Sequence, residues 1–355
     1  MSAFEPSRQA HDAYALDHVD HLPRAHGAPP LRGVLRQLPE DFIVEEVLKF
    51  EPSGAGEHLF LWVEKRGANT EWVAREIGRA FGTRRGDVAY AGMKDRHAVT
   101  RQWFSVSGAR GELPDIEGLE GTEWRVLRAV RHNKKLRHGA IKANRFCITA
   151  RDVEGERDAA ETRLATIARQ GVPNYFGEQR FGHNNIADAD AWARGTIMPP
   201  DAHTRGIWLS TLRSVLFNRV LATRVLAGCW NKMISGDAAM LSGSRSFFIV
   251  TDRDDEIAER CARFDIAPSG PLWGRGETPV RDAAARFEQA VLASAPEAWF
   301  AAMSAAGLEQ ERRPLVLSIG SPECERRGPE SVMFKFELAS GAYATCVLRE
   351  LMDTP

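Results

Sequence analysis

One short polar segment of the sequence places a single carboxylate among three side chains that are basic or can become so. The segment reads Gly-Met-Lys-Asp-Arg-His at residues 92–97, and its carboxylate is Asp95. Strand-like runs flank it on both sides, so we expect a loop between two strands. An aspartate that a cation keeps ionised in a partly dry pocket can act as a nucleophile or a general base. A surface turn in which Asp95 pairs with Lys94 or Arg96 fits the same residues, and their chemistry alone leaves both interpretations open.

The motifs of several common enzyme classes are absent from the sequence. It contains no GxxxxGK[ST] phosphate loop, no GxGxxG that opens a helix, no HExxH and no GxSxG. Metal-dependent phosphoryl transfer would need clustered carboxylates, and the cluster formed by Asp252, Asp254 and Asp255 is more typical of a loop or a helix start. The sequence therefore predicts no metal site.

Size, composition and cysteine content narrow the class of protein. A chain of 355 residues exceeds what one core usually covers, which predicts two domains. The 43% hydrophobic and 27% charged residues are typical of a globular protein, and no apolar run approaches the roughly 20 residues of a membrane span. The five cysteines form no CxxC pair and are odd in number, so we expect reduced packing residues. Residues 1–30 lack the apolar segment of a secretory signal peptide, and we expect a cytoplasmic protein with no membrane contact.

Basic residues are concentrated in one part of a chain whose net charge is only -1. Residues 124–151 contain no acidic side chain and nine lysines and arginines, which is typical of a surface that binds phosphates. The candidate phosphate contacts in this stretch are Arg131, Lys134, Lys135, Arg137 and Lys142. A solvated loop whose charges pair with acids elsewhere in the fold is the alternative.

Patterns of alternation and of three-to-four-residue spacing predict the elements that position these residues. The expected elements are strands at 41–47 and 58–64 that pair as a hairpin, a helix at 71–81, strands at 87–91, 101–106 and 144–151, helices at 154–170 and 208–227, a strand at 331–338 and a C-terminal helix through 351. The middle of the chain is richer in helices than its two ends. We therefore expect a sheet-rich domain built from both ends of the chain, with a second domain inserted between them.

Five blocks of the sequence, in the same order along the chain, resemble a known family. They read PEDFIVEE at 39–46, AGMKDRHAVT at 91–100, KLRHGAIKANRF at 135–146, GVPNYFGEQRFG at 171–182 and GAYATCVLREL at 341–351. Together they resemble the TruD family of tRNA pseudouridine synthases over residues 31 to 352. The resemblance implies an isomerase that converts uridine to pseudouridine in tRNA, at position 13, with no cofactor.

The resemblance also implies a fold and a domain plan. The fold is α+β, a pseudouridine synthase-like mixed and mainly antiparallel sheet flanked by helices, with an inserted α/β domain. The plan is a flexible tail at 1–30, a catalytic domain at 31–170 and 318–355, and an insertion domain at 171–317. The partner is tRNA, and a monomer is the default expectation. An RNA-binding protein or chaperone without catalysis is the alternative from another class, although the intact Asp95 motif counts against it.

Residue roles follow position by position from the resemblance. Asp95 resembles the aspartate that attacks the target nucleotide, either at C6 of the uracil or at C1′ of the ribose. Its carboxylate needs a nearby cation, and Arg36, just ahead of the 39–46 block, resembles the basic residue of the family there; a surface arginine is the alternative. Lys94 adjoins Asp95 but points the other way in an extended loop, so we expect it to reach an RNA phosphate or a structural partner.

The base pocket is expected to come from a strand and from the C-terminal block. Phe146 resembles the family's stacking residue and Asn144 its polar neighbour, and residues two apart on a strand face the same side. We expect Phe146→Ala to lower turnover far more than it lowers stability. Tyr343 departs from the family pattern, where a phenylalanine commonly stands, so its ring is expected to form a pocket wall that also carries a hydroxyl.

Overall fold

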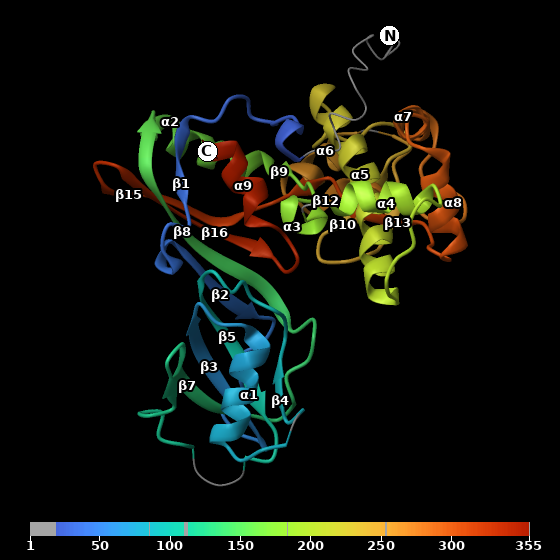
Figure 1. The fold of residues 1–355 in the computed structure, drawn as a ribbon. Helices are drawn as coiled ribbons and strands as arrows, with labels where there is room; N and C mark the ends of the chain where they lie inside the picture. Colours follow the sequence, from blue (N-terminus) through green and yellow to red (C-terminus); the bar gives the residue numbers. More distant parts are fainter. Residues whose placement is uncertain (1–18, 85, 110–112, 183, 253, 355) are drawn as a thin grey trace. The chain divides into compact units, whose positions relative to one another are not determined.

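The computed structural model describes residues 19–354 except 85, 110–112, 183 and 253 (Figure 1). The chain divides into two compact units, which we describe separately. The sheet unit comprises Pro29–Ala168, Ile319–Ala344 and Leu351–Pro355. The inserted unit comprises Met1–Ala28, Arg169–Ser318 and Thr345–Glu350. None of the helices in the described parts of the chain is long and apolar enough to cross a membrane.

The sheet unit is built on one eleven-stranded sheet with the central order β15-β16-β8-β2-β5-β3-β7-β6. Its strands are β1 (Leu31–Leu35), β2 (Phe42–Leu48), β3 (His58–Arg66), β4 (Val88–Tyr90), β5 (Val99–Val106), β6 (Glu120–Gly121), β7 (Trp124–His132), β8 (Ile141–Gly155), β15 (Gly320–Gly328), β16 (Ser331–Ala339) and β17 (Met352–Asp353). The pairs β2–β5 and β1–β17 are parallel and the other pairs are antiparallel. The prediction of a mixed, mainly antiparallel sheet in an α+β fold is confirmed.

The predicted hairpin between β2 and β3 is wrong, because β5 lies between the two strands. It runs parallel to β2 and antiparallel to β3. The loop between β2 and β3 instead folds onto the end of β7, where the backbone N–H of Ser53 donates to His132 Nδ1 at 3.1 Å. Gly56 has a φ of 125°, and a Cβ at this position would lie 2.4 Å from the His132 carbonyl oxygen, so only glycine fits there.

Two helices of the sheet unit match their predicted positions. Helix α1 (Thr70–Ala80) buries Val73 and Ile77 in a core formed with side chains of β3, β5 and β7. Helix α2 (Arg157–Gln170) buries Leu164 and Ile167. Strand β8, the long green strand of Figure 1, pairs with β16 on one side and with β2 and β1 in succession on the other. It therefore carries Asn144 and Phe146 in the middle of the sheet.

The inserted unit combines helices with a small antiparallel sheet. Its helices are α3 (Glu178–Phe181), α4 (Asn185–Ala193), α5 (Ala202–Leu226), α6 (Asp255–Ala262), α7 (Asp282–Leu292) and α8 (Glu297–Ala305). Strands β10 (Ala238–Leu241), β11 (Phe247–Ile249), β12 (Ile266–Leu272) and β13 (Glu311–Pro314) form a sheet in the order β11-β10-β12-β13, and β9 (Val172–Pro173) pairs with β14 (Val316–Leu317). The core helix α5 agrees with the amphipathic stripe predicted at 208–227.

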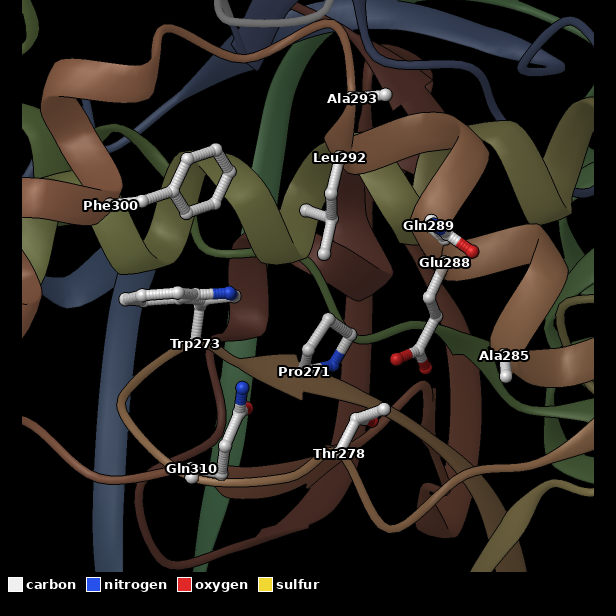
Figure 2. Close-up of a pocket in the computed structure, with 11 residues that line it drawn as sticks. Pro271, Trp273, Thr278, Ala285, Glu288, Gln289, Leu292, Ala293, Phe300 and Gln310 are labelled. Carbon is white, nitrogen blue, oxygen red and sulfur yellow. The ribbon is translucent and has the colours of Figure 1, made fainter.

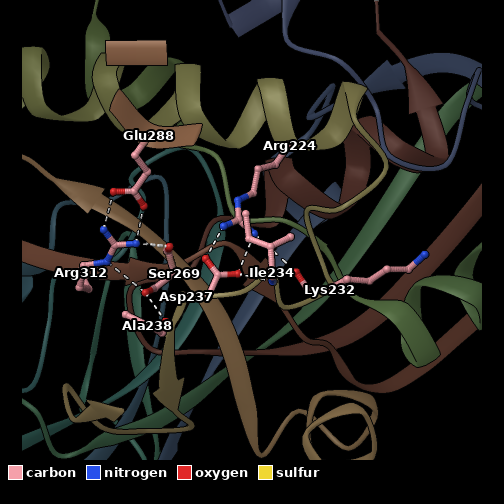
Figure 3. Close-up of polar contacts among 8 residues, drawn as sticks. All are labelled: Arg224, Lys232, Ile234, Asp237, Ala238, Ser269, Glu288 and Arg312. Carbon is pink, nitrogen blue, oxygen red and sulfur yellow. Dashed lines mark hydrogen bonds and ion pairs between the residues drawn. The ribbon is translucent and has the colours of Figure 1, made fainter. Parts of the chain in front are cut away.

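Two buried ion pairs fix the interior of the inserted unit (Figure 3). The guanidinium of Arg224, on α5, binds both carboxylate oxygens of Asp237, and neither side chain has any exposed surface. Arg312 on β13 binds both oxygens of Glu288 on α7 and also the hydroxyl of Ser269. Such two-point contacts fix geometry as well as charge. All four charged groups therefore have partners within the inserted unit.

The segment just before β1 is held by contacts with the C-terminal helix. Residues 1–18 of the expected tail lie outside the described residues. The following part is held in place, because the Glu350 carboxylate accepts hydrogen bonds from the backbone N–H groups of Ala25 and His26, each at 3.1 Å. Cys346 on helix α9 (Ala344–Leu351) donates its S–H to the Tyr175 carbonyl. The residues of α9 that make these contacts group with the inserted unit, and the domain plan expected from the sequence stays a prediction.

Candidate active site

The carboxylate of Asp95 lies in the loop between β4 and β5, as predicted, and two groups hold its oxygens. Arg36 Nη1 lies 2.9 Å from Oδ2, and the backbone N–H of His97 donates to Oδ1 at 3.0 Å. The side chain of Asp95 is 24% exposed and that of Arg36 is 33% exposed. The pair is thus neither buried nor freely solvated, and one face of the carboxylate remains accessible.

Arg36 reaches Asp95 from an unusual backbone conformation at the end of β1. Its φ is 59°, in the left-handed region that residues other than glycine rarely adopt. Its guanidinium lies over the ring of Phe42, 4.0 Å from the centroid, so a cation–π contact fixes the side chain from a second direction. Strained conformations of this kind cluster at functional sites. The predicted pairing of Arg36 with Asp95 is present in the structure.

Lys65, which sequence reasoning missed, anchors the backbone on both sides of this site. Its side chain is fully buried, and Nζ donates to the carbonyl oxygens of Asp95 and Ala68, each at 2.8 Å. Burial lowers the pKa of Lys65 to about 8, the Asp95 carboxylate acts in the opposite direction, and Lys94 lowers the pKa further. A signal existed, since Lys65 continues the alternation of Leu59, Leu61 and Val63 on the buried face of β3.

Side chains from α1 and β5 hold the rest of the loop. Thr70 Oγ1 accepts from the backbone N–H of Lys94 at 3.1 Å and donates to Gln102 Oε1 at 3.1 Å. Gln102 Nε2 in turn donates to the carbonyl of Gly92 at 3.3 Å. Both Thr70 and Gln102 are fully buried. The loop that carries Asp95 is therefore held by buried polar groups on two elements of the rigid scaffold.

Lys94 forms a buried ion pair with Glu46, which is the structural one of the two roles expected for it. Its Nζ lies 3.0 Å from Glu46 Oε1, with side-chain exposures of 7% for Lys94 and zero for Glu46. The other oxygen of Glu46 accepts from the backbone N–H of Trp103 at 3.0 Å. Burial raises the pKa of Glu46, and the charge of Lys94 acts in the opposite direction. The buried pair supports the structural role expected for Lys94, and contact of Lys94 with an RNA phosphate stays a prediction.

Phe146 lies in an aromatic group rather than on an open surface. It is 7% exposed, stacks on Phe336 with ring centroids 5.6 Å apart, and meets Phe42 edge to face at 6.1 Å. Because Arg36 covers Phe42, the aromatic group continues from Phe146 to the cation that binds Asp95. Asn144, two residues earlier on β8, has its Oδ1 buried without a hydrogen-bond partner among the described residues. An unpaired buried oxygen of this kind is available to a ligand.

Tyr343 lies in the turn between β16 and α9 and is partly buried. The register places Leu338 and Ala339, at the end of β16, opposite Asn144 and Ala143. The turn with Tyr343 therefore follows the end of β16 that adjoins Asn144. Its expected role as a pocket wall stays a prediction.

The basic stretch divides into paired and unpaired residues. Lys134, Arg137 and Lys142 are exposed, and the described residues include no ion pair to any of them. Lys135 is exposed and donates to the Gly86 carbonyl at 2.8 Å, while Arg131 is partly buried and contacts the Ala109 carbonyl. Three further basic residues pair with acidic side chains: Arg125, Arg145 and Arg151. The available positive charge thus concentrates around the β7–β8 connection.

No metal-binding cluster was found in the described residues. No group of three or more histidine, cysteine, aspartate or glutamate side chains is arranged to hold an ion in this part of the chain. In the acidic segment before α6, Asp254 caps the helix, because its carboxylate accepts from the backbone N–H of Ile257 at 2.9 Å. The helix start predicted there is confirmed.

A cavity of about 470 Å³ lies in the inserted unit (Figure 2). Trp273 and Phe300 form one wall, with ring centroids 4.9 Å apart, and Pro271 and Leu292 add apolar surface. Glu288 also lines the cavity (Figure 2), but both of its carboxylate oxygens bind Arg312. The cavity therefore offers no free charged group from these residues, and the chemistry concentrates around Asp95 in the sheet unit.

Comparisons with known proteins agree with the resemblance. The sequence profile of the family described as tRNA pseudouridine synthase D (TruD) matches residues 20–189 and 192–351. Proteins named tRNA pseudouridine synthase D from Xanthomonas axonopodis pv. citri and Methylococcus capsulatus are 47% and 46% identical to the chain; each match covers 94% of the chain, and 94% and 95% of the relative. A solved structure from Methanosarcina mazei, provisionally named tRNA pseudouridine synthase D (TruD), shares the fold at 22% identity, with a TM-score of 0.73 over 93% of this chain and 95% of that one. The chain belongs to the tRNA pseudouridine synthase D (TruD) family.

Proposed function

We propose that this protein isomerises uridine to pseudouridine in tRNA, at position 13, with Asp95 as the nucleophile. The observation that supports this role most strongly is the contact of 2.9 Å between Arg36 and the Asp95 carboxylate. A carboxylate attacks only while it is ionised, and the adjacent guanidinium favours that state. The exposed part of Asp95 leaves room for a nucleotide to approach.

The reaction needs no oxidant, reductant or group donor. The bond between N1 of the uracil and C1′ of the ribose breaks, the uracil turns, and a bond forms between C5 and C1′. The proton that leaves C5 is balanced by the proton that N1 gains. Asp95 forms a transient covalent bond either to C6 of the uracil or to C1′ of the ribose, and both routes use the same carboxylate.

The other proposed roles concern binding. A uridine must leave its stack to reach Asp95, and enzymes that act on bases receive the extruded base on aromatic and polar side chains. Phe146 and Asn144 are proposed for these roles, since the ring belongs to the aromatic group beside Arg36 and the amide oxygen lacks a partner. Tyr343 is proposed as a pocket wall.

Phosphate binding is proposed for basic residues around the β7–β8 connection. Lys134, Arg137 and Lys142 carry the most available charge, with Arg131 and Lys135 as further candidates. We propose the sheet unit as the catalytic domain, the inserted unit as a second RNA-binding domain, and the cytoplasm as the place where the protein works.

The experiment that tests the function maps pseudouridine at each uridine of tRNA from cells that lack this protein. The cells are complemented with the wild-type chain or with Asp95→Asn. We expect the loss of one site that only the wild-type chain restores. Restoration by Asp95→Asn would exclude Asp95 as the nucleophile, and an unchanged map in the deletion strain would exclude this reaction on tRNA.

A further inference from the structure

A second cavity lies beside the loop that carries Asp95, within the sheet unit. Its volume is about 320 Å³, and it is bounded by the turn at residues 67–69, by helix α1 and by the residue that follows Asp95. The side chains that matter for its chemistry are Asn69, Trp72, Arg75, Arg96 and Glu123. This combination of an indole, two guanidiniums and polar groups differs from the apolar lining of the cavity in the inserted unit.

The two arginines of this cavity have no carboxylate partner among the described residues. Arg75 Nε donates to the Glu71 carbonyl at 3.3 Å, and Arg96 Nε donates to the Gly67 carbonyl at 3.2 Å. These contacts hold the side chains in place through Nε and leave the terminal Nη groups for a ligand. Guanidiniums presented in this way bind phosphate oxygens through two parallel hydrogen bonds.

Trp72 supplies an aromatic wall next to this charge. Part of its ring packs against the core of α1, β3 and β5, and the rest lines the cavity. Nucleobases of unpaired RNA stack on such rings, and each stacked base contributes substantially to affinity. The Asn69 side chain makes no hydrogen bond to the helix it precedes, so its amide is available to the edge of a base. The carboxylate of Glu123 repels phosphate but accepts from an amino group.

From these features we infer that the cavity binds a second nucleotide of the tRNA, in addition to the target uridine. Its phosphate contacts Arg75 and Arg96, its base stacks on Trp72, and an exocyclic amino group of the base donates to Glu123. This inference rests on the proposed function, since it takes the RNA to be the substrate tRNA.

Hydrogen bonds connect the wall of the cavity to the loop that carries Asp95. Lys65 Nζ donates to the carbonyl of Ala68 in the cavity wall and to that of Asp95, each at 2.8 Å. Arg96 directly follows Asp95 and binds the turn at residues 67–69. A nucleotide in the cavity therefore contacts the same turn that positions Asp95, so it would fix the RNA close to the reacting carboxylate.

The test measures tRNA binding by the full chain as a function of salt, in an Asp95→Asn background that prevents turnover. We expect Trp72→Leu to weaken binding about tenfold, because it removes a stacked base, and Trp72→Phe to retain most of the affinity. Arg75→Gln should weaken binding and make the negative slope of log affinity against log salt shallower by about 0.7 to 0.9. Arg79→Gln is the matched control, since it lies one turn further along α1 and pairs with Glu76; we expect an unchanged slope.

Several outcomes would overturn the inference. Unchanged affinity for Trp72→Leu, in a variant that unfolds at the wild-type temperature, would show that no base stacks in the cavity. An Arg75→Gln slope equal to that of Arg79→Gln would show that no phosphate binds there. Product formation by the same variants with Asp95 intact separates the two hypotheses: a wild-type chain that makes no pseudouridine contradicts the proposed function, whereas an active wild type with unaffected cavity variants contradicts only this inference.

Discussion

Arg36 and Asp95, which are 59 positions apart in the sequence, meet at 2.9 Å between Nη1 and Oδ2. The arginine adopts a left-handed backbone conformation at the end of β1, and its guanidinium packs on Phe42. The aspartate projects from a loop held by Lys65 and Thr70. Two independently anchored groups thus converge on one ion pair, an arrangement that suits a carboxylate required to stay ionised and oriented.

Asp95→Asn should abolish product formation while leaving the fold and tRNA binding intact. The amide has the same shape and can still accept from the His97 N–H, but it is not a nucleophile. We expect single-turnover product formation to fall by about 10³-fold or more, as is usual when a covalent nucleophile is removed. Asp115→Asn, a change at an exposed loop residue, is the control and should keep the wild-type rate. A rate for Asp95→Asn within tenfold of wild type would exclude the role.

Arg36→Gly should separate activity from stability. Glycine relieves the cost of a φ of 59°, which is about 1 kcal/mol or more, and this gain offsets the loss of the exposed ion pair and the cation–π contact. We expect the free energy of unfolding to stay within about 1 kcal/mol of wild type, with turnover reduced more than tenfold. Arg36→Lys should restore part of the rate.

A matched control for the backbone effect is Ser321→Gly, because Ser321 also has a positive φ, of 46°, and lies in β15. This variant should be slightly stabilised and fully active. Wild-type turnover in Arg36→Gly would show that Asp95 does not need this cation.

How far the sequence predicts the structure depends on whether the information is local. The helix at 71–81 and the strand at 331–338 follow from periodicity, and the structure has them at 70–80 and 331–339. The hairpin between β2 and β3 failed because alternation identifies strands but not their partners. Strand β5, which separates them, begins 33 positions after β3 ends. The strands of the inserted unit were missed for two reasons. Strands β10, β11 and β13 carry only three or four residues, and β12 contains two prolines and a glycine, which are unusual within a strand.

The candidate site shows the same limit. Residue chemistry alone left Asp95 as either a nucleophile or a surface turn, and only the resemblance to a family pointed to Arg36. Lys65 escaped notice because lysines are usually exposed, although the alternation of β3 places it on the buried face. Lys94 was expected to bind either an RNA phosphate or a structural partner. It pairs with Glu46 because the fold brings β2 next to the loop that carries Lys94. Tertiary contacts therefore decide which basic residues serve structure and which face the substrate.

Lys65 should give the protein a specific pH dependence. Its pKa is about 8 in the folded chain and near 10.5 when unfolded. Between these values the unfolded chain binds more protons at this residue than the folded chain, so stability rises with pH there. We expect the difference in unfolding free energy, wild type minus Lys65→Met, to be constant below pH 8 and to increase from about pH 8 to 10.5. Denaturant unfolding at a series of pH values measures this difference.

Turnover should change in the opposite sense over the same range. Above pH 8 the Lys65 ammonium loses a proton and its hold on the carbonyls of Asp95 and Ala68 weakens, so kcat should fall. Lys65→Met should turn over slowly at every pH and lack this alkaline decline. An identical decline in Lys65→Met would assign it to another group.

The burial of Phe146 changes the test of its stacking role. A ring that is 7% exposed and packed on two other phenylalanines should cost about 3–5 kcal/mol on truncation to alanine, so Phe146→Ala would lose stability as well as turnover. Phe146→Leu keeps most of the volume. Phe336→Leu is its matched control on the adjacent strand. At similar unfolding free energies, we expect kcat to fall more for Phe146→Leu, and equal losses in both variants would exclude a stacking role.

The buried pair of Lys94 and Glu46 provides the last test, because it distinguishes a structural lysine from one that binds RNA. Lys94→Met leaves Glu46 buried without its cation and should lower the unfolding free energy by about 3–5 kcal/mol. The double variant Lys94→Met/Glu46→Gln removes both charges and should recover much of that loss, since a neutral pair has a smaller desolvation cost.

Salt dependence of tRNA binding completes the distinction. Lys94→Met should leave the negative slope of log affinity against log salt unchanged. Lys142 is at an exposed position of β8 and has no ion pair among the described residues. Lys142→Met should therefore make this slope shallower by about 0.7 to 0.9. A reduced slope in a stable Lys94→Met variant would show that Lys94 leaves Glu46 to contact the RNA. In that case the structural assignment made from the 3.0 Å contact would not hold for the bound protein.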